Sequence, residues 1–273
     1  CLFIMLFLVV CTAIISWFAA LYMFERPVFA ESVQQKTLLS AVLGEQRQYL
    51  VHLPESYKQA PEQRYPVIYA LDGSSQDLHI AASAALMARI GVTPEVIVVG
   101  IPNVSGKGRQ RDYTPPGMRQ DIDEADSPQG QADKFLTFLR QELIPQIAAD
   151  YRTDSTRLLA GNSRGGLFVV YALTAEPALF SAFIANSPAL WRDNDAMFSQ
   201  FDDFLRQNPA LSSRLFLSLG QQENAKMAGA FERTVALLQQ QAPRGLHWHA
   251  QRTVGAGHGN NALLATPVAL RWI

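Results

Sequence analysis

A serine between two glycines is the residue in this chain best suited to chemistry. The pentad Gly161-Asn162-Ser163-Arg164-Gly165 follows the apolar residues 158–160 and precedes a helical pattern over residues 166–171. Such a strand–turn–helix arrangement strains the serine backbone and lifts its hydroxyl above a sheet. It also leaves the N–H of the next residue, Arg164, free to hold an oxyanion. The competing interpretation is a glycine-rich turn without a catalytic role, but the flanking strand and helix favour Ser163 as a nucleophile.

A nucleophilic serine needs a base that takes its proton. Of the five histidines, His258 alone lies in a glycine-rich loop, Gly255 to Asn261, between the last predicted strand and the last predicted helix. Glycines on both sides allow unusual backbone angles that present the imidazole over the edge of a sheet. A lone loop histidine is usually a solvated surface residue. In α/β-hydrolases, however, the chain order is serine, acid, histidine, and this loop is where the base belongs. We therefore predict that His258 is the general base.

The acid is expected after the strand that lies between nucleophile and base along the chain. Glu223 is the first carboxylate after the predicted strand at residues 215–220. An acid there would fix the tautomer of His258 and stabilise the imidazolium. Glu223 is our prediction, and three alternatives stay open: a surface glutamate at a helix start, Glu232 as the acid, or a Ser–His dyad with no acid.

A second oxyanion donor is expected in the loop after the predicted strand at residues 67–71. That loop reads Asp72-Gly73-Ser74-Ser75, in which Gly73 allows a sharp turn. We predict that the N–H of Ser74 is the second donor. Asp72 is expected to brace the loop through hydrogen bonds.

Two residues are candidates for substrate binding, and each has a structural alternative. The planar guanidinium of Arg111 could bind a carboxylate, a catecholate or a phosphate. Alternatively, it could form a structural ion pair with Asp112 or Glu124, as a brace. Trp191 could line the mouth of a pocket or be a partly buried aromatic residue. The sequence has no histidine–carboxylate spacing typical of a metal site, no G-x-G-x-x-G and no P-loop, so we expect neither a metal nor a cofactor.

Strands and helical segments alternate along the chain after residue 46. Predicted strands cover residues 49–53, 65–71, 95–101, 157–160, 182–185, 215–219 and 246–250, and predicted helices cover residues 78–90, 135–147, 167–173, 231–240 and the segment from 261 onward. Strands separated by helices indicate βαβ units and a mostly parallel sheet with helices on both faces. We predict one α/β catalytic domain over residues 31–273.

Composition excludes several classes of protein. The chain of 273 residues carries a net charge of −1, which argues against a nucleic-acid partner because phosphate binding requires a basic face. Its 48% of hydrophobic residues is enough to build a core, so disorder is excluded. Both cysteines, Cys1 and Cys11, lie at the N-terminus, so no residue beyond them can supply a thiol nucleophile or a cysteine metal ligand.

The N-terminal segment Cys1–Phe24 contains no charged residue. As a helix it would span about 36 Å, enough to cross a hydrocarbon core of about 30 Å. Its length favours a transmembrane signal anchor, which would hold the catalytic domain on the inner membrane, facing the periplasm. Val28-Phe29-Ala30 also resembles a signal-peptidase site, and cleavage after Ala30 would release a soluble periplasmic or secreted protein.

Several motifs together resemble the putative-esterase branch of the α/β-hydrolases, which contains the enterobactin and bacillibactin esterases and, more distantly, S-formylglutathione hydrolase and the mycolyltransferases. The resemblance runs from about Gln46 to the C-terminus and rests on residues 69–73, 111–115, 132–136, 142–145, 161–168, 187–191 and 257–259. It implies an α/β-hydrolase fold, with Ser163 as nucleophile, His258 as base and Ser74 in the oxyanion loop. The chain departs from the family at Asn162, where histidine is usual, and at Arg164, where a small or apolar residue is usual.

The sequence thus predicts a serine hydrolase that cleaves carboxylic esters through an acyl-enzyme on Ser163. The resemblance implies siderophore-type esters as substrates. Alternatives are a membrane-tethered binding protein that kept the fold without catalysis, and an acyltransferase or amidase. Expected partners are a small-molecule ester and, through the N-terminal segment, a membrane.

Overall fold

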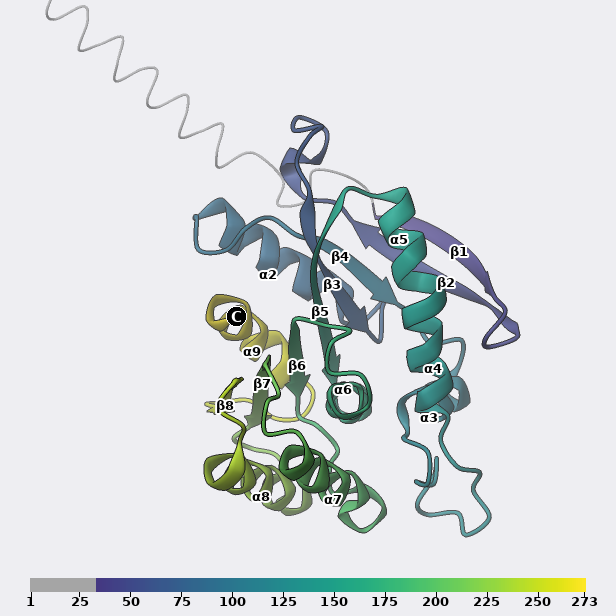
Figure 1. Cartoon of the computed structure of the whole chain (residues 1–273), viewed down its shortest axis with the longest axis vertical. Helices are drawn as coiled ribbons and strands as arrows, with labels where there is room; N and C mark the ends of the chain where they lie inside the picture. Colours follow the sequence, from purple (N-terminus) through teal and green to yellow (C-terminus); the bar gives the residue numbers. More distant parts are fainter. Residues whose placement is uncertain (1–32) are drawn as a thin grey trace, which may run out of the picture.

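The computed structural model describes residues 33–273, which Figure 1 draws in colour. The predicted anchor or signal segment, Cys1–Phe24, and the predicted cleavage site after Ala30 lie outside the described residues. Within residues 33–273, no helix combines the length and the apolar character that crossing a bilayer requires.

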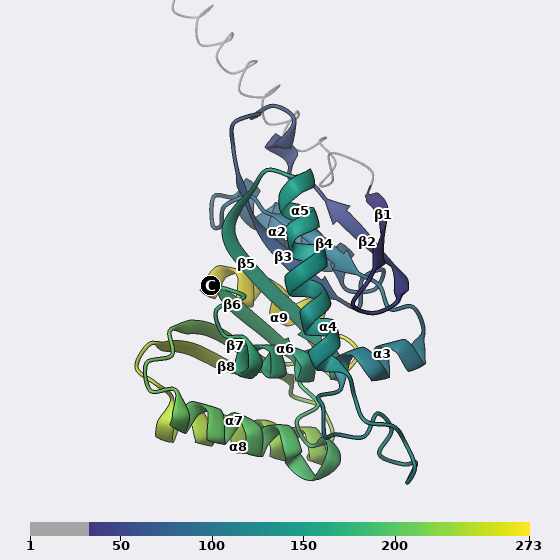
Figure 2. The same ribbon diagram turned by 45° about the vertical axis from the view of Figure 1, so that its right-hand side comes forward.

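One eight-stranded sheet runs through the described chain, in the order β1-β2-β4-β3-β5-β6-β7-β8. Its strands are β1 (Gln34–Ser40), β2 (Glu45–His52), β3 (Tyr65–Leu71), β4 (Ile97–Ile101), β5 (Thr153–Asn162), β6 (Ala182–Asn186), β7 (Ser213–Gly220) and β8 (Leu246–Thr253). Strands β3 to β8 run parallel to one another. Strands β1 and β2 form an antiparallel pair at one edge of the sheet, and β2 is also antiparallel to β4 (Figures 1 and 2). The sheet is therefore mostly parallel, as the sequence predicted.

The connecting segments are mainly helical. They are η1 (Glu55–Tyr57), α2 (Asp77–Arg89), α3 (Gly106–Tyr113), α4 (Ala132–Phe138), the π-helical segment η2 (Leu139–Leu143), α5 (Ile144–Asp150), α6 (Arg164–Ala175), α7 (Arg192–Gln207), α8 (Ala225–Gln241) and α9 (Asn261–Trp272). The helix expected over residues 135–147 is interrupted by η2, and α5 begins anew with Pro145 in its first turn. Proline is accepted there because the first N–H groups of a helix have no acceptor within it.

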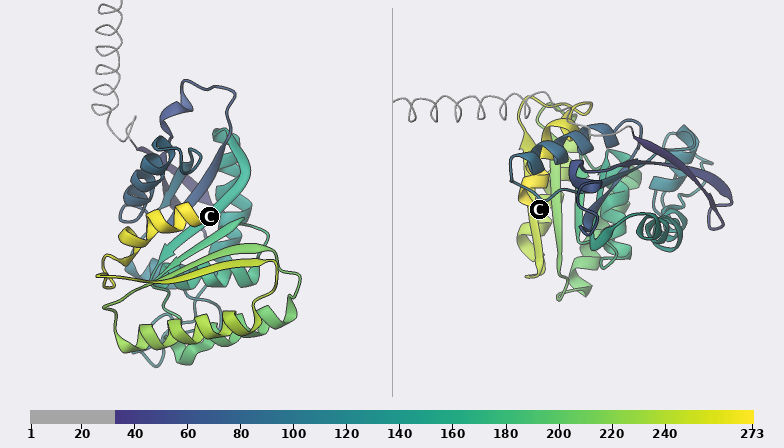
Figure 3. Two further views of the ribbon diagram at one scale, coloured as in Figure 1. Left: turned by 90° about the vertical axis from the view of Figure 1, so that its left-hand side faces the viewer. Right: turned by 90° about the horizontal axis from the view of Figure 1, so that it is seen from above.

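Helices cover both faces of the sheet. On one face, α2 and α9 pack together over a smaller core that contains Ile68, Phe216 and Ala265. The other helices pack over a larger core on the opposite face, and Figure 3 shows α7 and α8 on the far side of the sheet from α2 and α9. Strands buried on both faces read as continuous apolar runs, as β4 and β6 do here.

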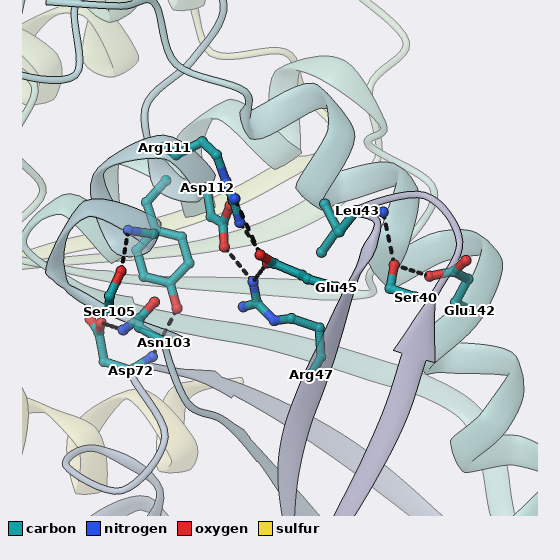
Figure 4. A network of polar contacts seen from close by, with 12 residues as sticks. Ser40, Leu43, Glu45, Arg47, Asp72, Asn103, Ser105, Arg111, Asp112 and Glu142 are labelled. Atoms are coloured by element: carbon teal, nitrogen blue, oxygen red, sulfur yellow. Dashed lines mark hydrogen bonds and ion pairs between the residues drawn. The ribbon is translucent and has the colours of Figure 1, made fainter.

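A buried ion network ties β2 to α3 beside the larger core (Figure 4). Arg47 is 0% exposed, and its Nη1 donates to Asp112 Oδ2 at 2.6 Å and to Glu45 Oε1 at 2.9 Å. Its guanidinium carbon lies 5.2 Å from the centre of the Phe135 ring. Arg111 completes the network, donating to Asp112 at 2.7 Å and to Glu45 at 2.6 Å. A buried guanidinium is tolerated because both carboxylates neutralise it.

We expect Asp112→Ala to lower the free energy of unfolding by about 3–5 kcal/mol, because the change leaves the charge of Arg47 buried and poorly compensated. Urea unfolding followed by circular dichroism measures the loss. The matched control is Asp203→Ala, which removes the exposed partner of Arg206 and should cost less than about 1 kcal/mol. Equally small losses in both variants would contradict a structural role for the network.

Candidate active site

Ser163 occupies a one-residue turn between the end of β5 at Asn162 and the start of α6 at Arg164. Its backbone has φ +59° and ψ −114°, a conformation that side-chain-bearing residues rarely adopt and that costs about 1–3 kcal/mol. The turn is held by its surroundings: the N–H of Ser163 donates to the Asn186 carbonyl at 2.9 Å, and its own carbonyl accepts from the N–H of Ala189 at 3.1 Å. The serine is thereby fixed at the carboxyl edge of the parallel strands.

Close contacts restrict both glycines of the pentad, a backbone contact at Gly161 and a side-chain contact at Gly165. A Cβ added to Gly161 would lie 2.5 Å from the carbonyl oxygen of Gly165, where β5 and α6 cross. A Cβ on Gly165 would lie 3.2 Å from Asp72 Oδ2, in the loop after β3. Small residues at these positions allow the sharp strand-to-helix turn that the sequence predicted.

Three predicted residues from separate loops form one hydrogen-bonded chain. His258, in the loop between β8 and α9, has its Nε2 atom 2.9 Å from Ser163 Oγ. Its Nδ1 atom lies 2.8 Å from Glu223 Oε2 in the loop after β7. This order of hydroxyl, imidazole and carboxylate is the geometry of a nucleophile activated by an oriented base. The alternative acid, Glu232, instead pairs with Arg252 at 2.9 Å.

The carboxylate of Glu223 is buried and fully supplied with donors. It accepts from the Gly220 N–H at 2.9 Å and from the Ser187 hydroxyl, in addition to His258. Burial alone would raise the pKa of Glu223, but the hydrogen bonds from His258, Ser187 and Gly220 outweigh it and hold the pKa below its ordinary range. Glu223 therefore stays ionised at neutral pH.

A buried polar chain connects this acid to the serine turn. Asn261 Nδ2, at the start of α9, donates to Ser187 Oγ at 2.8 Å and to Ser218 Oγ at 3.0 Å. Ser218 in turn donates to Asn186 Oδ1 at 2.7 Å, and the carbonyl of Asn186 holds the Ser163 N–H. The sequence analysis assigned no role to Ser218 or Asn261, because neither residue belongs to a motif with a recognisable spacing.

The predicted oxyanion donors differ in their surroundings. Arg164 is the first residue of α6, where N–H groups have no acceptor within the helix, so its N–H is oriented for a ligand beside Ser163. The N–H of Ser74, predicted to be the second oxyanion donor, instead donates to Asp77 Oδ1 at 2.8 Å. Ser74 lies in the loop two residues before Gln76, the N-cap of α2, and Asp77 at the start of the helix reaches back to its N–H.

The two predicted binding residues lie in different places. A cavity of about 220 Å³ opens beside Ser163, and Trp191 lines it, as one of the two interpretations predicted. The full lining is Arg109, Ser163, Arg164, Ala189, Trp191, Arg192, Asn224, Met227 and His258. Arg111 is not part of this lining, so the interpretation that it binds substrate is wrong. The alternative, a brace paired with Asp112, is confirmed, with Glu45 in place of Glu124 as the second partner. Glu45 and Asp112 occupy its guanidinium, so it acts as a brace.

Asp72 braces its loop as expected. It accepts from Arg109 Nε at 2.6 Å and Nη2 at 2.8 Å, and from Asn103 Nδ2 at 2.6 Å. The guanidiniums of Arg164 and Arg192 complete the polar wall of the cavity, and sequence reasoning missed both side chains. Among residues 33–273, no group of histidine, cysteine or acidic side chains is arranged to hold a metal ion.

Comparisons with known proteins agree on one family. The model of the "Putative esterase" family matches residues 40–260. Ferri-bacillibactin esterase BesA of Bacillus subtilis is 30% identical over 59% of this chain and 61% of its own length, and the siderophore enterobactin esterase of Emericella nidulans is 31% identical over 57% of each. The match thus spans about three fifths of these relatives. The crystal structure of an IroE-like serine hydrolase from Shewanella oneidensis superposes with a TM-score of 0.79 and 28% identity, over 88% of this chain and 79% of that one.

The lowered pKa of Glu223 predicts how stability changes with pH. A carboxyl group whose pKa is lower in the folded than in the unfolded state stabilises the fold above its unfolded value, and this contribution is lost as pH falls through the folded value. Wild type should therefore be more stable than Glu223→Gln at pH 7, and the gap should shrink as pH falls below about 4.3. Urea unfolding between pH 3 and pH 7 tests this, with Glu232→Gln as an exposed control. A gap that widens on acidification would contradict the assignment.

Proposed function

The chain belongs to the "Putative esterase" family, and from this premise we propose that it is a serine hydrolase that cleaves carboxylic esters. The observation that carries the proposal is the hydrogen-bonded chain from Ser163 through His258 to the buried carboxylate of Glu223. A catalytic role explains why a strained serine, a half-exposed imidazole and a buried carboxylate meet at one cavity.

The geometry supports a two-stage reaction. Ser163 Oγ attacks the ester carbonyl while His258 Nε2 takes its proton, and the N–H of Arg164 stabilises the oxyanion. The tetrahedral intermediate collapses, the carbon–oxygen bond to the alcohol breaks, and His258 returns the proton to the departing alkoxide. A water molecule then attacks the acyl-enzyme with the same base, which releases the acid and restores Ser163. Glu223 holds Nδ1–H of His258 and stabilises the imidazolium in both stages.

The relatives support a substrate class. Two of them carry the names of esterases for ferri-bacillibactin and enterobactin, and these names support a siderophore-type ester as the substrate of this chain. The predicted N-terminal anchor or signal segment would place the reaction outside the cytoplasm.

Substitution of the serine and the base tests the proposal. Ser163→Ala and His258→Ala should each lower kcat for a neutral 4-nitrophenyl ester by at least about 10³-fold, and the double variant should lose little more, because the two residues act as one unit. Alanine tolerates the positive φ at residue 163 no worse than serine does, so thermal unfolding should be nearly unchanged.

Near-wild-type turnover by Ser163→Ala would overturn the assignment of the nucleophile. Additive losses in the double variant would show that the serine and the histidine act independently. Arg233→Gln, at an ion pair with Asp195 outside the catalytic cavity, serves as the unaffected control.

A further inference from the structure

The cavity beside Ser163 carries more positive charge than its carboxylates neutralise. Three guanidiniums line it, from Arg109, Arg164 and Arg192. Arg109 is paired, because Asp72 accepts from two of its nitrogens at 2.6 and 2.8 Å. Among the described residues, neither Arg164 nor Arg192 has a carboxylate within ion-pair distance.

Arg192 is a buried cation with unused hydrogen-bonding capacity. It is 9% exposed, its Nη2 donates to the carbonyl of Gln120 at 3.0 Å, and its buried Nε finds no acceptor in the described chain. An ionised group taken out of water without a partner is costly. Asp121, Asp123 and Asp193 attract it only from a distance. The side chain is thus held in the cavity wall without a carboxylate partner among residues 33–273.

Arg164 adds a second cation whose hydrogen-bond partners are neutral. Its Nη1 donates to Thr114 Oγ1 at 2.8 Å and to the same Gln120 carbonyl at 2.7 Å. Burial, together with repulsion from Arg192 and Arg109, lowers the pKa of Arg164 to about 10, so it is still charged at neutral pH.

We propose that Arg164 and Arg192 form an anion subsite that selects esters with a carboxylate on the acyl part. The proposal rests on the proposed function and specifies its substrate. Guanidinium groups bind carboxylates through paired, charge-assisted hydrogen bonds, and the bound anion would neutralise two cations that have no carboxylate partner in the described chain.

The position of the base assigns the carboxylate to the acyl part. His258 must protonate the departing alcohol, so the alcohol lies on the side of His258, whose side chain is 48% exposed. The acyl part then lies on the other side of Ser163, and we place it against Arg164 and the buried Arg192. The volume of about 220 Å³ is below the roughly 300–1,000 Å³ of drug-sized sites, so esters with short acyl chains are suitable probes.

A matched pair of esters tests this subsite. Mono-4-nitrophenyl glutarate and 4-nitrophenyl pentanoate share the leaving group and the length of the acyl chain and differ in one carboxylate. The wild-type chain should prefer the glutarate ester in kcat/KM by about tenfold or more, which is the range expected for a charge-assisted hydrogen bond. Arg192→Met and Arg164→Met should each remove most of this preference, and Arg192→Lys should keep part of it.

Two controls separate the outcomes. Arg233→Met should keep the preference within about twofold of wild type, because Arg233 lies outside the catalytic cavity. Free glutarate should raise the unfolding temperature of the wild-type chain and not that of Arg192→Met, a readout that needs no turnover.

Equal turnover of the two esters, or a preference that survives in both methionine variants, would overturn the subsite and leave the proposed function intact. If neither ester is cleaved while glutarate binds in an Arg192-dependent way, the hydrolase proposal fails and the anion site stands. If the wild-type chain shows neither a preference for the glutarate ester nor stabilisation by free glutarate, the subsite is refuted.

Discussion

The backbone of Ser163 is strained, and contacts from the rest of the site keep it in that conformation. A φ of +59° at a serine persists only because several contacts determine it together: the bonds to Asn186 and Ala189, and the crossing of β5 and α6 at Gly161 and Gly165. Neighbouring parallel strands provide these contacts, since β6 lies beside β5 in register from Leu158 to Asn162. A mostly parallel sheet buried on both faces is thus the support that a strained nucleophile needs.

The same buried polar atoms that hold the serine also hold the acid. Glu223 bonds to Ser187, which is reached by Asn261, and Asn261 is joined through Ser218 to the strand that anchors the serine turn. In a low-dielectric interior, hydrogen bonds are stronger than in water, so these shared partners fix the acid and the serine turn relative to each other. The exposed imidazole of His258 lies between two fixed groups, the Ser163 hydroxyl and the Glu223 carboxylate. It can therefore exchange protons with substrate while its orientation is kept.

Sequence reasoning recovered the features that depend on local order and missed those that depend on contacts across the fold. Ser163, His258 and Glu223 were found because their elements follow one another in the chain, and β4 because a continuous β-branched run indicates a doubly buried strand. The strand β1 was missed because its burial alternates at a sheet edge, and α7 because it begins with left-handed residues 193–195. Side-chain partners were missed most often. Neither the bond from the Ser74 N–H to Asp77 nor the pairing of Arg111 with Glu45 could be read from spacing alone.

The central claim is that Ser163 is the single activated nucleophile of the described chain. Labelling with a fluorophosphonate, followed by peptide mapping with mass spectrometry, tests it most directly, because this reagent forms a stable adduct with a serine hydroxyl that an adjacent base deprotonates. The account predicts one adduct, on the peptide that contains Ser163, formed quickly in the folded protein and lost after unfolding. An adduct on a different serine, or no adduct at all, would contradict it.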